Sequence, residues 1–156
     1  MQISNNASYP LASIVKAGKP DQAFFFQLYV NSERHKTEEL LSKAKPLGIK
    51  AIFVTIDAPV PGKREADERL AAGNLSSAVS GATAVNDKKG GGLGRVMAKY
   101  IDSSLNWADL DWLKRTSGGL PIVLKGVQTA ADAKRALDYP VDAILLSNHG
   151  GRSLDT

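Results

Sequence analysis

The chain contains no cysteine, only two histidines, and no apolar run long enough to cross a membrane. Without cysteine, disulfides, thiolate nucleophiles and cysteine-ligated zinc or iron–sulfur centres are excluded, and two histidines are too few for most metal sites built from protein ligands. The chain start lacks the basic segment and apolar core of a signal peptide. Redox chemistry would therefore need a bound organic cofactor. We expect a soluble protein, and its compartment stays open between cytoplasm, peroxisome and mitochondrion.

The charge is only weakly one-sided, with 20 Lys and Arg residues, 16 Asp and Glu residues and a net charge of +4. Basic residues are scattered among acidic ones instead of forming a stripe, so we expect no nucleic-acid partner. The excess charge suits an anionic small molecule. With 156 residues, 43% of them hydrophobic, the composition is that of one soluble globular domain.

Four short, nearly continuous apolar segments predict β-strands. They cover residues 24–30, 51–57, 121–127 and 142–147. Such runs are typical of parallel strands that are covered on both faces. Helical signals lie between them, and this strand–helix alternation predicts a parallel α/β sheet.

Capping residues indicate where the helices begin. Thr37 is expected to cap one helix, because Glu38 and Glu39 follow in the first turn, where carboxylates favour the positive end of the helix dipole. Thr129 and Asp132 have the spacing of a capping box at the start of another helix. Further helices are expected over 8–18 and 106–115.

Residues from about 60 to 105 break this alternation. The segment is rich in Ala, Ser, Gly, Asn and Lys, most clearly over 71–94, and shows little periodicity. It predicts a long mobile loop. The glycines at 90–94 could form a phosphate cradle, but no strand precedes them and no Lys-Ser/Thr pair follows, so a flexible linker is the favoured interpretation.

Polar residues gather at the carboxyl ends of the predicted strands. Side chains alternate along a strand, so residues of equal parity share a face. On each face an apolar residue comes first and polar ones follow: Phe25, Gln27 and Tyr29; Phe53, Thr55 and Asp57; Val123 and Lys125; Leu145, Ser147 and His149. Both (β/α)8 barrels and doubly wound sheets bind ligands at this edge, so the pattern predicts a site without deciding between the two folds.

Each of these residues also has a structural interpretation. Thr55 is β-branched and common in strands, and Gln27 and Tyr29 could satisfy ordinary hydrogen bonds at a strand end. Lys125 and Asp57 are harder to explain in this way, because a charge in an apolar strand loses hydration and needs a partner or a route to solvent. Several such groups on one edge indicate a ligand site.

The chain carries the segment Ser-Asn-His-Gly-Gly-Arg at 147–152, directly after the last predicted strand. A histidine can exchange a proton near neutral pH, two glycines allow a tight turn, and an arginine can bind a carboxylate bidentately. These groups are suited to removing a proton from a small acid.

With three further motifs, this segment resembles the FMN-dependent α-hydroxy-acid oxidases and dehydrogenases, a family that includes glycolate oxidase and flavocytochrome b2. The further motifs are FQLYV at 26–30, VTIDAP at 54–59 followed by GKREAD at 62–67, and IVLKGV at 122–127. The resemblance extends over essentially the whole chain and implies a partial (β/α)8 TIM barrel. One departure is Ser153, which stands where the family usually has Gln.

The resemblance implies that four residues bind the cofactor FMN. Ser4, Gln27 and Thr55 would hydrogen-bond the polar edge of the isoalloxazine ring. Lys125 would stabilise negative charge on the reduced ring.

The resemblance also implies the catalytic and substrate-binding groups. His149 would be the base, and Asp57 would pair with it and favour its protonated form. Arg152 and Tyr29 would bind the substrate, a small L-2-hydroxy acid that is oxidised to the 2-keto acid, and Arg64 would support the same anion.

Residues 1–156 are thus expected to form a single incomplete FMN hydroxy-acid dehydrogenase domain, truncated at both ends and covering about the second to the sixth barrel strand. We expect this piece alone to bind FMN weakly or not at all. The electron acceptor would be oxygen or a cytochrome, and complete family members often form homotetramers. One alternative is a non-catalytic α/β remnant without cofactor, and another is an aldolase-type barrel that uses Lys125 as a Schiff-base amine.

Overall fold

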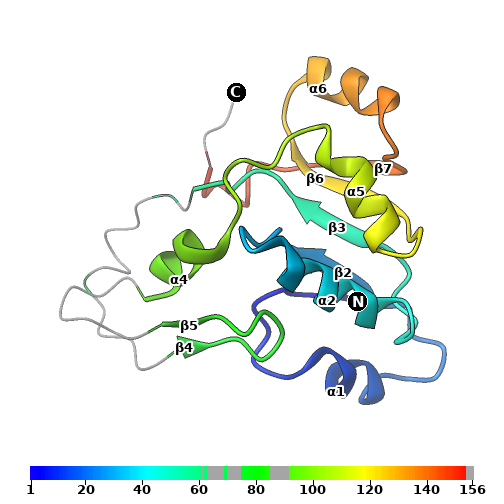
Figure 1. Cartoon of the computed structure of the whole chain (residues 1–156), viewed down its shortest axis with the longest axis vertical. Coiled ribbons are helices and arrows are strands. Elements are labelled where there is room, and N and C mark those ends of the chain that lie inside the picture. Colours follow the sequence, from blue (N-terminus) through cyan, green and yellow to red (C-terminus); the bar gives the residue numbers. More distant parts are fainter. Residues whose placement is uncertain (61, 63–68, 70–74, 85–91, 154–156) are drawn as a thin grey trace.

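A computed structural model of the chain describes residues 1–60, 62, 69, 75–84 and 92–153 (Figure 1). In this part of the chain, five strands form one parallel sheet. The strands are β1 (Gln2–Ile3), β2 (Phe25–Leu28), β3 (Ile52–Thr55), β6 (Ile122–Val127) and β7 (Ala143–Leu146). They lie in the sheet in chain order, as in a barrel wall, whereas a doubly wound sheet reverses its order at a switch point. The predicted α/β fold is confirmed, and the strand order is that of a partial barrel.

Helices connect the strands of this sheet. They are α1 (Leu11–Lys16), α2 (Arg34–Ala44), α5 (Asp109–Thr116) and α6 (Ala130–Arg135), the last continuing into the 3-10 turn η1 (Ala136–Asp138). Figure 1 shows α2 and α5 lying against the sheet. Thr129 caps α6 as predicted, since its hydroxyl accepts the backbone N–H of Asp132 at 3.0 Å, but the Asp132 carboxylate accepts from the Thr129 hydroxyl at 2.7 Å and so completes the pair differently from a capping box.

Alternate side chains of each strand point to opposite faces of the sheet, one covered by helices and the other open. The covered face packs under the helices and forms the core, which includes Phe26, Leu28, Leu41, Ile52, Val54, Leu113, Ile122 and Leu124. On the opposite face Phe25, Phe53 and Val123 are only partly buried. Full burial of one such aliphatic or aromatic side chain contributes about 1.5–3 kcal/mol, so the covered face stabilises the sheet and leaves the other available for a site.

The helix expected to begin at Thr37 begins earlier. The helix α2 starts at Arg34, and Thr37 lies inside it. The Thr37 hydroxyl accepts the backbone N–H of Asn31 at 2.9 Å, and the Asn31 side chain accepts the N–H of Glu33. The prediction that Thr37 is the cap was wrong. Thr37 lies inside the helix, and its hydroxyl accepts a backbone N–H of the turn that precedes the helix.

The segment 60–105 is not a loop throughout. Strands β4 (Leu75–Ser76) and β5 (Thr83–Ala84) form an antiparallel pair, and α4 (Gly92–Tyr100) is a helix. Met97 and Tyr100 are three residues apart on α4 and are buried together with Tyr29. The prediction was wrong there, because the glycines at the start of α4 hid this helical spacing. The rest of the expected loop, at 61, 63–68, 70–74 and 85–91, lies outside the described residues.

None of the helices in the described ranges has both the length and the apolar character that crossing a membrane requires.

Candidate active site

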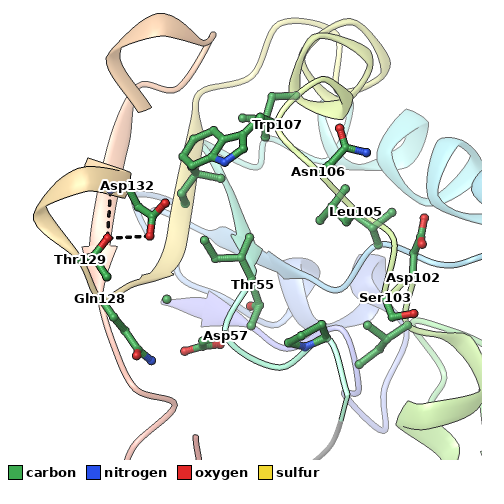
Figure 2. A pocket seen from close by; sticks show the side chains of 17 residues that line it. Thr55, Asp57, Asp102, Ser103, Leu105, Asn106, Trp107, Gln128, Thr129 and Asp132 are labelled. Atoms are coloured by element: carbon green, nitrogen blue, oxygen red, sulfur yellow. Dashed lines mark hydrogen bonds between the residues drawn. The ribbon is translucent and has the colours of Figure 1, made fainter. Parts of the chain in front are cut away.

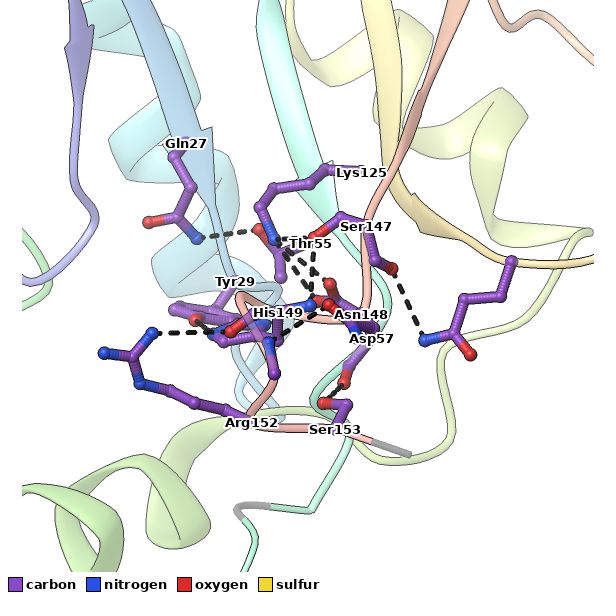
Figure 3. A network of polar contacts seen from close by, with 12 residues as sticks. Gln27, Tyr29, Thr55, Asp57, Lys125, Ser147, Asn148, His149, Arg152 and Ser153 are labelled. Atoms are coloured by element: carbon purple, nitrogen blue, oxygen red, sulfur yellow. Dashed lines mark hydrogen bonds and ion pairs between the residues drawn. The ribbon is translucent and has the colours of Figure 1, made fainter. Parts of the chain in front are cut away.

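A cavity of about 330 Å³ opens at the carboxyl ends of the parallel strands. Its lining residues are Gln27, Tyr29, Thr55, Lys125, Ser147, His149, Gly150 and Arg152. All the strand residues in this set have the parity that the sequence assigned to one face, since alternate side chains of a strand point the same way. Figure 3 shows how the polar side chains of this region converge.

A short polar contact beside the cavity joins Asp57 and His149. Oδ1 of Asp57 lies 2.6 Å from Nδ1 of His149, and the two side chains are 0% and 17% exposed. Because a carboxylate only accepts hydrogen bonds, the contact places a proton on Nδ1. The other ring nitrogen, Nε2, lies 3.2 Å from the hydroxyl of Tyr29. In the neutral ring Nε2 can accept a proton, so the geometry suits a general base.

Lys125 shares the same carboxylate. Its Nζ donates to Oδ2 of Asp57 at 3.1 Å and to the hydroxyl of Ser147 at 3.4 Å. Burial by itself would raise the pKa of the Asp57 carboxyl, but the hydrogen bonds from His149 and Lys125 and the charge of Lys125 outweigh it, and the pKa lies below its ordinary value. Asp57 is thereby held as an anion between two donors.

The loop after β7 aims His149 at the cavity through an unusual backbone. His149, Gly150 and Gly151 have positive φ values of 62°, 65° and 75°. Two glycines adopt this conformation readily, whereas a histidine with positive φ carries a strain of about 1–3 kcal/mol. Asn148 and Ser147 offset it, because their side chains accept the backbone N–H groups of Gly151 and His149.

Gln27 and Thr55 form a second polar pair on neighbouring strands. The Gln27 amide donates to the Thr55 hydroxyl at 3.0 Å and accepts the backbone N–H of Asn5. With Lys125, whose Cα is the register partner of Thr55, they make a row of hydrogen-bonding groups across β2, β3 and β6. Such a row can bind the edge of a flat heterocycle that carries carbonyl groups.

Among the described residues, two predicted site residues, Ser4 and Arg152, make no hydrogen bond to the side chains of this constellation. Ser4 is exposed, does not line the cavity, and accepts the N–H of Asn6 within its own turn. Arg152 lines the cavity rim, and its guanidinium donates to the His149 carbonyl at 3.4 Å. Arg64 lies outside the described residues. The substrate and cofactor roles of all three stay predictions.

A larger cavity, of about 500 Å³, lies next to the site and is shown in Figure 2. Thr55 and Asp57 contribute to its lining, together with residues before and within α5 and at the start of α6, such as Trp107 and Asp132. His149, Tyr29 and Lys125 line the smaller cavity and not this one. Because the candidate base His149 lines the smaller cavity together with Tyr29 and Lys125, we assign the candidate active site to the smaller cavity.

Sequence reasoning missed two contributors to the site. Gly126 contacts Asp57 at a bulge of β6, and the signal for it was a glycine inside an apolar strand. The Ser153 hydroxyl donates to the backbone carbonyl of Asp57 at 2.6 Å. No local sequence pattern could predict that contact, because 96 residues separate Ser153 from Asp57.

Comparison with known proteins places these features in a family. Residues 1–156 match the FMN-dependent dehydrogenase family. The chain is 42% identical over 154 residues to L-lactate dehydrogenase (cytochrome) of Saccharomyces cerevisiae, covering 98% of this chain and 26% of that protein. It is 37% identical to human 2-hydroxyacid oxidase 1, covering 99% of this chain and 44% of that protein.

Solved structures agree with the sequence relatives. The recombinant flavin-binding domain of baker's yeast flavocytochrome b2 superposes with a TM-score of 0.78 at 40% identity, covering 99% of this chain and 34% of that one. A mandelate oxidase with (S)-4-hydroxymandelic acid gives a TM-score of 0.86 at 29% identity, covering 99% and 44%. The chain thus spans between about a quarter and under half of the length of these relatives. The family match over the whole chain and the shared fold show that this protein belongs to the FMN-dependent dehydrogenase family, as its four motifs predicted.

Proposed function

We propose that residues 1–156 carry the catalytic centre of an enzyme that oxidises an L-2-hydroxy acid of the lactate or glycolate type to its 2-keto acid. The observation that supports this most strongly is the chain of contacts from Asp57 through His149 to Tyr29 beside the row of Gln27 and Thr55. A base with a fixed tautomer next to a hydroxyl is suited to accepting a proton from a bound hydroxy acid.

The polar row fits the edge of FMN, which offers carbonyl oxygens and ring nitrogens. An ammonium carries three N–H donors, and Asp57 and Ser147 accept from Lys125, which leaves donor capacity for a carbonyl oxygen in the cavity. Gln27 and Thr55 would hold the neighbouring atoms, and Ser4 would be a further contact from the end of β1. Bound FMN would accept the two electrons of the oxidation.

The substrate would bind between His149 and the rim of the cavity. Arg152 would hold the carboxylate, with Arg64 supporting the same anion, and Tyr29 would donate to a substrate oxygen. His149 would take the proton at Nε2, and Asp57 would stabilise the imidazolium that forms, since an opposite charge favours the charged state. Removal of the hydroxyl proton and removal of the Cα proton both use this nitrogen.

We further infer that these residues form one incomplete domain. In the described part of the chain the sheet is open, and Leu146 on its last strand β7 is 70% exposed. A closed (β/α)8 barrel would cover this strand. Full FMN affinity and turnover would therefore need further barrel strands. The electron acceptor, oxygen or a cytochrome, and assembly into a tetramer stay predictions.

A chimera tests this proposal, with residues 1–156 replacing the matching segment of the yeast L-lactate dehydrogenase (cytochrome). We expect the chimera to bind FMN and its flavin absorbance to bleach when L-lactate or glycolate is added. The chain alone, titrated with FMN, should quench flavin fluorescence weakly or not at all. A chimera that is folded and binds FMN but never bleaches would favour the non-catalytic alternative.

The aldolase alternative has less support from the geometry. A Schiff-base lysine attacks as a neutral amine, whereas Lys125 is engaged by the buried Asp57 carboxylate. Borohydride trapping of a keto acid on Lys125 would revive that alternative.

A further inference from the structure

Asp57 lies beyond the last residue of β3, so the strand ladder does not fix its position. The ladder's last bond here runs from the N–H of Ile56 to the carbonyl of Lys125, at 2.9 Å. Even so, the Asp57 carboxylate contacts both Lys125 and His149, and its side chain is fully buried. Other neighbours must therefore hold this residue in place.

Gly126 is the neighbour on the side-chain side of Asp57. The register of β6 against β7 shifts between Lys125 and Val127, which makes Gly126 the extra residue of a β-bulge, with φ of +111°. A Cβ atom built on Gly126 would lie 2.4 Å from Cβ and 2.6 Å from Cγ of Asp57. A Cβ atom essentially never approaches a non-bonded heavy atom this closely. Bulges beside active sites re-aim side chains, and here only a glycine leaves room for the carboxylate.

Ser153 is the neighbour on the backbone side. Its hydroxyl donates to the Asp57 carbonyl at 2.6 Å, and its own N–H donates to the Asn148 carbonyl at 3.0 Å. Figure 3 shows Ser153 below Asp57, on the same loop that carries His149. Ser153 thus connects the backbone of Asp57 to the loop that presents the imidazole.

We propose that Gly126 and Ser153 are positioning residues that hold Asp57 against His149. Gly126 supplies the space for the carboxylate and Ser153 fixes the backbone behind it. The catalytic meaning of this arrangement rests on the proposed function, whereas the arrangement itself can be measured without FMN or substrate. Failure of one proposal is therefore distinguishable from failure of the other.

Gly126→Ala tests the first contact, with Gly119→Ala as its matched control. Gly119 also has positive φ, +80°, but a Cβ there would meet nothing within 4 Å, so the control reports backbone strain alone. Proton NMR of the intact chain follows the Nδ1 proton of His149, which a short hydrogen bond to a carboxylate shifts to low field. We expect Gly126→Ala to lose this resonance and Gly119→Ala to keep it.

The titration of the Asp57 carboxyl gives a second readout of the same variants. In Gly126→Ala the side-chain ¹³C resonance of Asp57 should titrate at higher pH than in the parent chain. The reason is that burial raises this pKa once the hydrogen bonds from His149 and Lys125 are lost. A Gly126→Ala chain that is folded and retains both the low-field proton and the parent titration overturns the role of Gly126.

Ser153→Ala tests the second contact and decides the outcome if Gly126→Ala does not fold. Ser42→Ala is the matched control, because the Ser42 hydroxyl also donates to a backbone carbonyl, at 2.7 Å, but at an exposed position of α2. We expect the low-field resonance to weaken in Ser153→Ala, to return in Ser153→Thr, and to be unchanged in Ser42→Ala. In the chimera, Ser153→Ala should lower kcat about tenfold with KM unchanged. An unchanged resonance and unchanged kcat in Ser153→Ala would overturn the proposal.

Discussion

Oδ1 of Asp57 lies 2.6 Å from Nδ1 of His149, although 92 residues separate the two in the chain. The contact joins the loop after β3 to the loop after β7, and Lys125 of β6, the strand between them, donates to the same carboxylate. One buried anion therefore connects three strand ends, and the predictions for the site follow from it.

Replacement of His149 by glutamine should remove the base while leaving the fold intact. In the chimera we expect kcat for L-lactate to fall by about 10²- to 10⁴-fold, the usual contribution of a general base, with FMN affinity unchanged. The matched control is His35→Gln, since His35 is the other histidine and its side chain is 70% exposed on α2. Stopped-flow bleaching of the flavin measures both. Near-full turnover in His149→Gln would exclude this residue as the base.

Asp57→Asn should change how stability depends on pH. The pKa of Asp57 is lowered in the folded chain, so its carboxylate stabilises the fold above the unfolded pKa of about 4. This stabilisation is lost as pH falls through the folded pKa. At pH 7 the substitution should lower the free energy of unfolding by about 3 kcal/mol, because Lys125 and His149 lose the buried anion that they contact.

Urea unfolding between pH 7 and pH 3 measures this effect. The difference between the parent chain and Asp57→Asn should shrink as pH falls, while Asp21→Asn, at an exposed turn, should follow the parent at every pH. A difference that stays constant with pH would contradict the assignment of the lowered pKa to Asp57.

Tyr29→Phe should weaken substrate binding without affecting the fold. The substitution removes the hydroxyl that lies 3.2 Å from His149 and keeps the ring that packs with Met97 and Tyr100. Loss of one hydrogen bond of about 1 kcal/mol corresponds to roughly a fivefold decrease in kcat/KM of the chimera. Tyr9→Phe, at an exposed position, is the control and should leave kcat/KM unchanged.

Arg34 should stabilise the connection between α2 and α5. Its guanidinium donates to Asp102 at 2.8 Å and to Asp109 at 3.1 Å, and it stacks on Trp112. We expect Arg34→Ala to cost about 1–3 kcal/mol in the free energy of unfolding. Lys43→Ala, which removes an exposed pair with Glu39, should cost much less, because solvent screens an exposed ion pair. Equal effects in urea unfolding would contradict this ranking.

The prediction for the hydrophobic core compares a buried leucine with an exposed one. Leu113 on α5 is 1% exposed and Leu137 on η1 is 83% exposed. Leu113→Ala should lower the free energy of unfolding by about 2–5 kcal/mol, because it leaves a cavity under the helix. Leu137→Ala should stay within about 0.5 kcal/mol of the parent chain. Thermal unfolding followed by circular dichroism measures both.

Much of the fold could be read from local pattern. The apolar runs around Phe26, Val54 and Leu124 identified the parallel strands, because such strands carry nearly continuous apolar sequence, although one face of this sheet is only partly buried. The alternation rule assigned Gln27 and Thr55 to one face, since side-chain direction on a strand has a period of two. These features depend only on neighbours in the sequence, so the sequence by itself determined them.

Tertiary structure decided what depends on distant partners. Thr37 is an internal acceptor instead of a cap because the chain turns back at Asn31, and α4 is a helix because Met97 and Tyr100 pack on Tyr29. The space for Asp57 beside Gly126 likewise exists only where the loop after β3 meets the bulge of β6. Sequence alone placed the chemical groups at the strand ends, whereas the distances between them follow from how the folded sheet brings separate loops together.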